Sequence, residues 1–162
     1  MNKYFRFGIF VFFILILDQI TKYWIHRELA LYDSIEVVAG LFNIVYIRNS
    51  GAAFGILANS NSFWVPVFFI AVSLFAFVLL FFILRGVAES DKISIFAIAS
   101  IFGGALGNFI DRISRGEVVD FLDFYWGAFH WPSFNVADSF ISIGVVLFMV
   151  INVFARKKVL QK

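Results

Sequence analysis

The chain has 162 residues, of which 62% are hydrophobic and only 15% are charged, and its mean hydropathy is +0.91. A soluble domain of this length would carry about a quarter charged residues, so lipid is the expected solvent for the apolar excess. The absence of cysteine excludes disulfides, Fe–S clusters, thiolate zinc sites and cysteine nucleophiles. The net charge is only +2 and no basic stripe is present, so nucleic acid is not an expected partner.

Four segments are long and apolar enough to cross a bilayer, which takes about 20 residues of helix. They lie at about residues 7–25, 63–84, 93–112 and 136–155, and we expect one integral membrane domain over 1–162. The first span follows Lys3 and Arg6 as the apolar part of a signal peptide would. No small-x-small cleavage site follows it, so we interpret it as an uncleaved helix.

The basic residues predict how the spans are oriented. Eight lie at the two termini and between the second and third spans: Lys3, Arg6, Arg85, Lys92, Arg156, Lys157, Lys158 and Lys162. Five lie in or near the two longer connecting segments, at about 27–62 and 113–132: Lys22, Arg27, Arg48, Arg112 and Arg115. Because basic residues favour the cytoplasmic side, both termini are expected in the cytoplasm and both longer segments outside.

The first outer segment is expected to carry structure of its own. Residues 34–48 are rich in β-branched and aromatic residues, interrupted by Gly40 and Asn43, which predicts two short strands or a hairpin. The sequence Asn-Ser-Gly at 49–51 is a turn signal. Residues 52–57 are predicted to form a short helix on the membrane surface.

Polar residues in three of the spans share one helix face near the outer end. The spacings i, i+3 and i+4 bring side chains to the same face of a helix. The three sets are Asp18, Thr21 and Lys22; Asn108, Asp111 and Arg112; and Asn135, Asp138, Ser139 and Ser142. Ionisable groups are costly in hydrocarbon, so three polar faces at one depth are expected to meet one another and indicate a functional site.

Each polar set also fits a purely structural role. Asp18 and Lys22 have the spacing of an i,i+4 ion pair, and Asn135 stands at the expected N-cap of the fourth helix with Asp138 at N3. Three glycines of the third span form a small-xxx-small pattern that favours close helix packing: Gly103, Gly104 and Gly107. The convergence of three sets, rather than any single residue, favours function.

The available side chains favour hydrolysis by paired aspartates. Only two histidines occur and neither lies in a metal-binding pattern, so no metal or other cofactor is expected and a serine nucleophile lacks a base. Two close carboxylates in a low dielectric share a proton, so one can activate water while the other donates to a peptide carbonyl. Asp138 is one candidate, and its partner remains open among Asp111, Asp120 and Asp123.

Five blocks of the sequence resemble the motifs of bacterial lipoprotein signal peptidases. They are Asp-Gln-Ile-Thr-Lys at 18–22, Arg-Asn-Ser-Gly-Ala-Ala-Phe-Gly at 48–55, Gly-Gly-Ala-Leu-Gly-Asn-Phe-Ile-Asp-Arg at 103–112, Val-Val-Asp-Phe at 118–121 and Phe-Asn-Val-Ala-Asp-Ser at 134–139. They occur in the family's order and spacing and extend over nearly the whole chain. The resemblance implies signal peptidase II, an aspartic endopeptidase that cuts prolipoproteins just before their diacylglyceryl-modified cysteine.

The resemblance also implies a fold and a set of site residues. The fold is an all-α membrane protein with four transmembrane helices, a small extracytoplasmic β-cradle and a short interfacial helix. The catalytic pair is Asp120 and Asp138, whereas the polar face of the third span favours Asp111. Asp111 is adjacent to Arg112 and is expected to be ion-paired nearby. The supporting residues are expected to be Asn49, Asn108, Arg112 and Asn135 for shaping the site and binding substrate, Gly51 for loop closure, Asp18 and Lys22 for bracing the first helix, and Asp111 as a further structural member.

The implied partners are diacylglyceryl-modified prolipoproteins and membrane lipid, with the chain acting as a monomer in the bacterial inner membrane and its site near the outer face. The main alternative is a small proton- or ion-coupled transporter, which predicts ionisable groups spread across the membrane and often an inverted repeat. A third hypothesis is a non-catalytic scaffold held together by the glycine-rich helix, which would not require paired aspartates.

Overall fold

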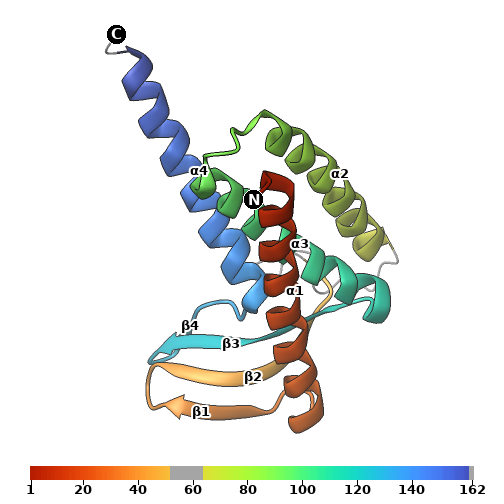
Figure 1. Ribbon diagram of the computed structural model, residues 1–162. Coiled ribbons are helices and arrows are strands. Elements are labelled where there is room, and N and C mark those ends of the chain that lie inside the picture. Colours follow the sequence, from red (N-terminus) through yellow and green to blue (C-terminus); the bar gives the residue numbers. More distant parts are fainter. Residues whose placement is uncertain (52–63, 161–162) are drawn as a thin grey trace.

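The computed structural model describes residues 1–51 and 64–160. All four expected spans are helices: α1 (Lys3–Glu28), α2 (Trp64–Gly86), α3 (Lys92–Arg115) and α4 (Val136–Leu160). Each is long and apolar enough to cross a membrane. The helices run roughly alongside one another, and a small sheet lies against the lower end of α1 and the start of α4 (Figure 1).

Local signals explain why the helices begin and end where they do. The Asn2 side chain caps α1 by accepting from the backbone N–H of Tyr4 at 2.8 Å, so this helix begins earlier than its apolar run. The Asp91 carboxylate caps α3 through the backbone N–H of Ser94 at 3.0 Å. Gly116 ends α3 in the left-handed region with φ of 77°, where a residue with a Cβ would be strained.

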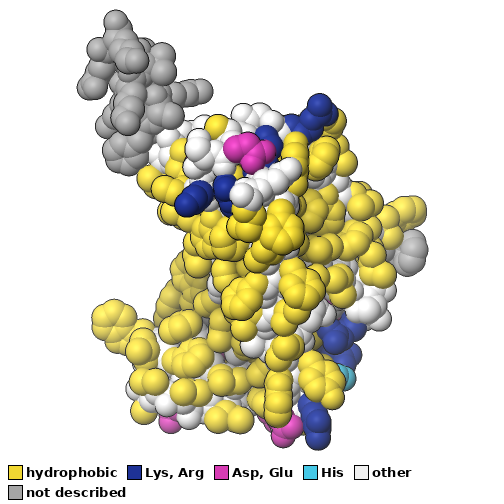
Figure 2. Space-filling model, viewed as in Figure 1, with side chains coloured by type: hydrophobic (Ala, Val, Ile, Leu, Met, Phe, Trp, Pro, Cys, Tyr) yellow, Lys and Arg dark blue, Asp and Glu magenta, His cyan; other side chains and the backbone are white. Residues whose placement is uncertain are grey.

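The third helix is the centre of the bundle, in contact with α1, α2 and α4. In the apolar 18-residue stretch of α3, 56% of the residues are buried inside the protein, against 11% in the corresponding stretch of each of the other three helices. Those three therefore leave wide apolar faces for lipid. Figure 2 shows this broad hydrophobic surface between two ends at which Lys and Arg side chains gather.

Glycines bring α3 and α4 into close contact, as the small-xxx-small pattern predicted. A Cβ at Gly104 would collide with the backbone oxygen of Ala137 and the side chain of Ile141 on α4. A Cβ at Gly144 would lie 2.7 Å from the backbone oxygen of Ala97 on α3. The two backbones touch at these points, which fixes the first turn of α4 against α3.

The two longer connecting segments form a four-stranded antiparallel sheet in the order β1 (Ser34–Val38), β2 (Phe42–Asn49), β3 (Val118–Trp126) and β4 (Phe129–His130). The hairpin predicted within 34–48 is confirmed as β1 and β2. The other half of the sheet comes from the second connecting segment, in which the residue pattern predicted no strand. The surface helix predicted at 52–57 lies outside the described residues.

The sheet is fixed to the bundle through the end of α1. Ile25 of α1 packs with Tyr46, Val119 and Phe121 of the two central strands in one buried cluster. Strand β3 pairs with β2 so that Val118 faces Asn49 and Asp120 faces Ile47. This register holds Asp120 beside the helix ends that lie nearest the sheet.

Candidate active site

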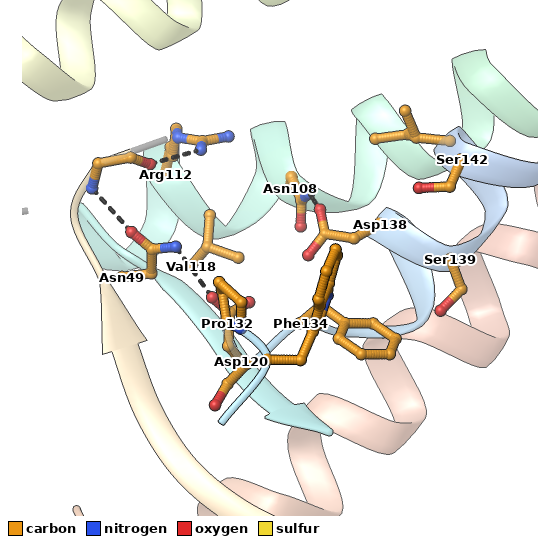
Figure 3. Close-up of a pocket in the computed structure, with 14 residues that line it drawn as sticks. Asn49, Asn108, Arg112, Val118, Asp120, Pro132, Phe134, Asp138, Ser139 and Ser142 are labelled. Atoms are coloured by element: carbon orange, nitrogen blue, oxygen red, sulfur yellow. Dashed lines mark hydrogen bonds between the residues drawn. The ribbon is translucent and has the colours of Figure 1, made fainter. Parts of the chain in front are cut away.

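A cavity of about 450 Å³ lies where the ends of β2 and β3 meet α3 and α4. It is lined by Asn49, Gly51, Asn108, Arg112, Val118, Asp120, Trp131, Pro132, Ser133, Phe134, Asp138, Ser139, Ile141 and Ser142. Figure 3 shows the side chains of Asp120 and Asp138 entering this space from β3 and α4, with Pro132 and Phe134 close by. The cavity therefore combines two carboxylates with amide and apolar walls.

Asp120 is almost fully buried, with 2% of its surface exposed. Its Oδ2 accepts from Asn49 Nδ2 at 2.9 Å, and its Oδ1 accepts from Asn135 Nδ2 at 2.8 Å. Burial, and secondarily the neighbouring Asp138 charge, raise the pKa of Asp120 to about 7. A carboxyl group with this pKa can hold or release a proton near neutral pH.

Asp138 is held by the first turn of α4. Its backbone N–H donates to Asn135 Oδ1 at 2.9 Å, while its Oδ2 accepts from the Asn135 backbone N–H at 3.2 Å. This reciprocal pair is a capping box, so the predicted N-cap and N3 positions are confirmed. Its Oδ1 also accepts from Asn108 Nδ2 at 2.7 Å. Asp138 therefore both caps α4 and lines the cavity.

Asn135 contacts both carboxylates, since its side chain donates to Asp120 and its backbone N–H donates to Asp138. This fully buried amide donates to Asp120 and to Asn108 Oδ1, at 2.8 and 3.2 Å, and accepts from the backbone of Asp138. Asn108 in turn donates to Asp138. The two amides thus restrict the rotation of both carboxylates, and the capping residue of α4 is also a member of the site.

A buried ion cluster lies behind these amides. Lys22 Nζ is 2.8 Å from Asp18 Oδ2, 2.8 Å from Asp111 Oδ2 and 2.9 Å from Asn108 Oδ1. Arg115 contacts Asp111 at 2.7 Å. Asp111 is thus ion-paired as expected, but through Lys22 and Arg115 and not through its neighbour Arg112. The three polar helix faces do meet.

Asp18 joins α1 to the start of α4. Its Oδ1 accepts from the backbone N–H of Ala137 at 2.9 Å, which satisfies one of the free donors at the helix N-terminus. Gly107 makes this approach possible, because a Cβ there would collide with the Asp18 carboxylate. The role expected for Asp18 and Lys22 is broadened: they brace α1 against both α3 and α4.

Arg112 and Gly51 lie together at the rim of the cavity. Arg112 Nη2 donates to the backbone oxygen of Gly51 at 3.3 Å, and its guanidinium lies 4.8 Å from the ring centre of Phe69. The backbone N–H of Gly51 donates to Asn49 Oδ1 at 3.0 Å, so the predicted turn also orients the amide that holds Asp120. Closure of the loop after Gly51 concerns residues outside the described ranges.

The three candidate partners of Asp138 have different surroundings. Asp120 lines the cavity, and Asp111 belongs to the ion cluster. Asp123 is also buried but accepts from Asn43 at 3.0 Å and lies 3.0 Å from His130 Nδ1, away from the cavity lining. Asp120 is therefore the aspartate that shares the cavity with Asp138.

Several contributors were missed in the sequence, among them the cavity-lining residues Trp131, Pro132, Ser133 and Ile141. Gln19 Nε2 contacts Asp18 at 3.1 Å and the Gly107 backbone oxygen at 3.3 Å, and nothing in its spacing indicates this bridge. Arg115 stands four residues after Asp111, so i,i+4 spacing could have identified that pair.

Comparison with known proteins decides which family has this arrangement. The family described as Signal peptidase (SPase) II matches residues 10–154. The chain belongs to this family. A relative named lipoprotein signal peptidase from Geobacter sulfurreducens is 52% identical over 136 residues, or 84% of each chain. Another of that name, from Syntrophus aciditrophicus, is 46% identical over 145 residues, or 90% of this chain and 89% of the relative.

Solved structures agree with the fold. A bacterial membrane enzyme determined by the in meso method is 36% identical and superposes with a TM-score of 0.84, over 94% of this chain and 90% of that one. A second enzyme described in the same way is 38% identical, with a TM-score of 0.76 over 90% of each chain. The predicted helical membrane fold with a small sheet is confirmed, as is membership in an aspartic peptidase family.

Proposed function

We propose that this chain is a signal peptidase II that cuts prolipoproteins before their diacylglyceryl-modified cysteine, with Asp120 and Asp138 as the catalytic pair. One observation carries the proposal: both carboxylates line one cavity, and the Asn135 amide group contacts both residues. Membership in the signal peptidase II family, and relatives named lipoprotein signal peptidase, support the substrate class.

The two aspartates divide the proton transfers of peptide hydrolysis. Asp120 has a pKa of about 7, so about half of it is protonated at neutral pH, and this protonated form carries the shared proton. Asp138 stands at the N-terminus of α4, where the helix dipole favours a negative charge. The Asp138 carboxylate takes a proton from water as the water oxygen attacks the scissile carbonyl carbon, and Asp120 donates its proton to the carbonyl oxygen.

The second half of the reaction returns both groups to their starting states. As the tetrahedral intermediate collapses, the C–N bond breaks and Asp138 gives its proton to the leaving amine nitrogen. The former carbonyl hydroxyl returns its proton to Asp120 as the new carboxyl group forms. Asn49, Asn108 and Asn135 hold the carboxylates in place throughout, because each donates to one or both of them.

The walls of the cavity fit a lipidated peptide. Val118, Ile141 and Phe134 are apolar and suit the acyl-bearing side chain, while Arg112 and the amides offer donors to peptide carbonyls. The apolar walls also keep Asp120 away from bulk water, which is the main cause of its raised pKa. Gly51 belongs to the same rim and orients Asn49.

We further infer that the chain is a single multi-pass domain, active as a monomer, in the bacterial inner membrane, with both termini cytoplasmic and the cavity near the outer face. The distribution of Lys and Arg supports this orientation. A transporter would need ionisable groups at several depths. Among the described residues, the buried charged groups lie on the sheet side of the bundle, apart from Lys3.

The test compares two synthetic precursor peptides that differ only in the diacylglyceryl group on cysteine. The purified chain in detergent is incubated with each, and the products are identified by mass spectrometry. We expect cleavage on the amino side of the modified cysteine and at least about a hundredfold slower cleavage of the unmodified peptide. Equal cleavage of both peptides, or a cut elsewhere, would contradict the proposed specificity.

A further inference from the structure

A second cavity, of about 380 Å³, lies at the end of the bundle opposite the sheet. It is lined by Met1, Arg6, Ile9, Phe10 and Lys92, so it lies between the first turns of α1 and the start of α3. The N-terminus of α1 and the α2–α3 connection lie together at this end of the molecule (Figure 1). The catalytic cavity shares no lining residue with it.

The two cations of this cavity are not neutralised by the carboxylates near them. Arg6 Nη1 donates to the backbone oxygen of Glu89 at 2.6 Å. The Glu89 carboxylate itself accepts from the Lys3 backbone N–H at 2.8 Å, and the Asp91 carboxylate caps α3. Within the described part of the chain, neither Arg6 nor Lys92 forms an ion pair. Two positive charges therefore face one opening.

Lys3 lies at the same end of the bundle, but its ammonium group is already bonded within the protein. Its ammonium donates to the backbone oxygens of Arg85 at 2.9 Å and Val87 at 2.7 Å, so it satisfies the carbonyls at the end of α2. Lys3 is accordingly buried. Arg6 and Lys92 remain as the cations available to a ligand.

The floor of the cavity is apolar and continues along the outside of α1. Phe10 packs edge-to-face on Phe96 with ring centres 5.1 Å apart, which closes the floor between α1 and α3. Ile9 is 46% exposed, and Phe13, one turn further along the same face, is 63% exposed. The two cations, Arg6 and Lys92, thus lie next to an exposed hydrophobic stripe on α1, a membrane-spanning helix.

We propose that this cavity binds an anionic phospholipid, with its phosphate between Arg6 and Lys92 and an acyl chain along Ile9 and Phe13. Basic pockets between transmembrane helices bind anionic headgroups through this combination of charge and adjacent apolar surface. A free phosphate ion would use the charges but leave the apolar stripe without a partner. The bound lipid bridges α1 and α3 at the end where Lys3 already ties α1 to α2.

The test measures lipid retention by the purified full chain in a neutral detergent, with native mass spectrometry and thermal unfolding as readouts. The probes are phosphatidylglycerol, phosphatidylcholine with the same acyl chains, and inorganic phosphate. The variants are Arg6→Gln and Lys92→Gln, and the matched control is Arg85→Gln, which removes one charge at the same end outside the cavity. If Arg6→Gln fails to fold, the comparison of Lys92→Gln with Arg85→Gln is the test.

We expect phosphatidylglycerol, but not phosphatidylcholine or inorganic phosphate, to be retained and to raise the unfolding temperature. Each cavity variant should weaken retention about fivefold, and Arg85→Gln should leave it unchanged. The proposal is overturned if Arg85→Gln weakens retention as much as Lys92→Gln, if the two lipids are retained equally, or if inorganic phosphate gives the same stabilisation. Asp120→Asn should retain the lipid normally, so this test is independent of the catalytic proposal.

Discussion

Lys22 is the side chain through which the buried ion cluster reaches the proposed catalytic cavity. It is fully buried between Asp18 and Asp111, and it also donates to the Asn108 oxygen. The other end of the Asn108 amide donates to Asp138. A cation on α1 thus fixes which way this amide points, and so which of its atoms meets the carboxylate on α4.

Lys22→Met should destabilise the protein by about 3–5 kcal/mol, because it leaves two buried carboxylates without their shared cation. The free energy of unfolding is measured by denaturant titration in detergent. The matched control is the double variant Lys22→Met/Asp18→Asn, which removes one of the uncompensated charges and should recover part of the loss. Unchanged stability in the single variant would show that the cluster does not contribute as described.

Asp120 gives the site a pH dependence whose direction follows from its raised pKa. Its pKa rises from the ordinary 3.8 to about 7 in the folded protein, so ionisation is less favourable when folded. Its stabilising contribution is therefore fully present below about pH 4 and is lost as pH rises through about 7. Relative to Asp120→Asn, wild-type stability should fall between these limits, and kcat/KM should fall about tenfold per pH unit above about 7. If the stability of wild type and of Asp120→Asn changed with pH in the same way, ionisation of Asp120 would not be the cause.

At the scale of helices, the crossing of α3 and α4 sets the distance between Asn108 and Asp138. Gly104→Ala introduces a methyl group against Ala137 and Ile141, so α4 must move away from α3. We expect the free energy of unfolding to fall by about 1–3 kcal/mol. Activity should fall proportionally more, because the 2.7 Å hydrogen bond from Asn108 to Asp138 is stretched.

Gly8→Ala is the matched control for this prediction. Gly8 also lies inside a helix, but nothing stands within 4 Å of the added methyl group. This substitution should be neutral or stabilising by up to about 1 kcal/mol, since alanine has the higher helix propensity. If both variants have the same unfolding temperature and activity as wild type, close contact between α3 and α4 is not required.

The β-strands show how far the sequence predicts the part of the chain outside the four spans. The hairpin at β1 and β2 was predictable because its β-branched and aromatic residues are local and are interrupted by turn residues. Strand β3 was not, because buried Asp120 and Asp123 interrupt its apolar pattern. Their partners, Asn49 and Asn43, come from β2, more than 70 residues earlier. Only the folded sheet brings these side chains together.

At the scale of the whole molecule, bilayer thickness made the four spans predictable, since length and apolar composition alone define them. The spacing of Asn135 and Asp138 likewise predicted the cap of α4. The polar faces favoured Asp111 over Asp120, because spacing within α3 does not show that Lys22 of α1 pairs with Asp111. A charged partner from another helix is invisible to spacing within one helix; the motif resemblance supplied the choice.

The proposed orientation predicts which ends of the helices a membrane-impermeant reagent can reach. The chain contains no cysteine, so single-cysteine variants have no background. In intact bacterial spheroplasts, Glu28→Cys at the end of α1 should react with an impermeant maleimide, whereas Ser90→Cys between α2 and α3 should react only after permeabilisation. The reverse pattern would invert the orientation.

The most direct test of the central claim is single-turnover cleavage of a diacylglyceryl-modified precursor by Asp120→Asn and Asp138→Asn. The matched control is Asp123→Asn, on the same strand as Asp120 and also buried, but bonded to Asn43 and His130 outside the cavity lining. We predict rates lower by about 10²–10⁴-fold in the first two variants and near wild-type in the control, with all three folded. A near wild-type rate in folded Asp120→Asn would contradict the assignment of the pair.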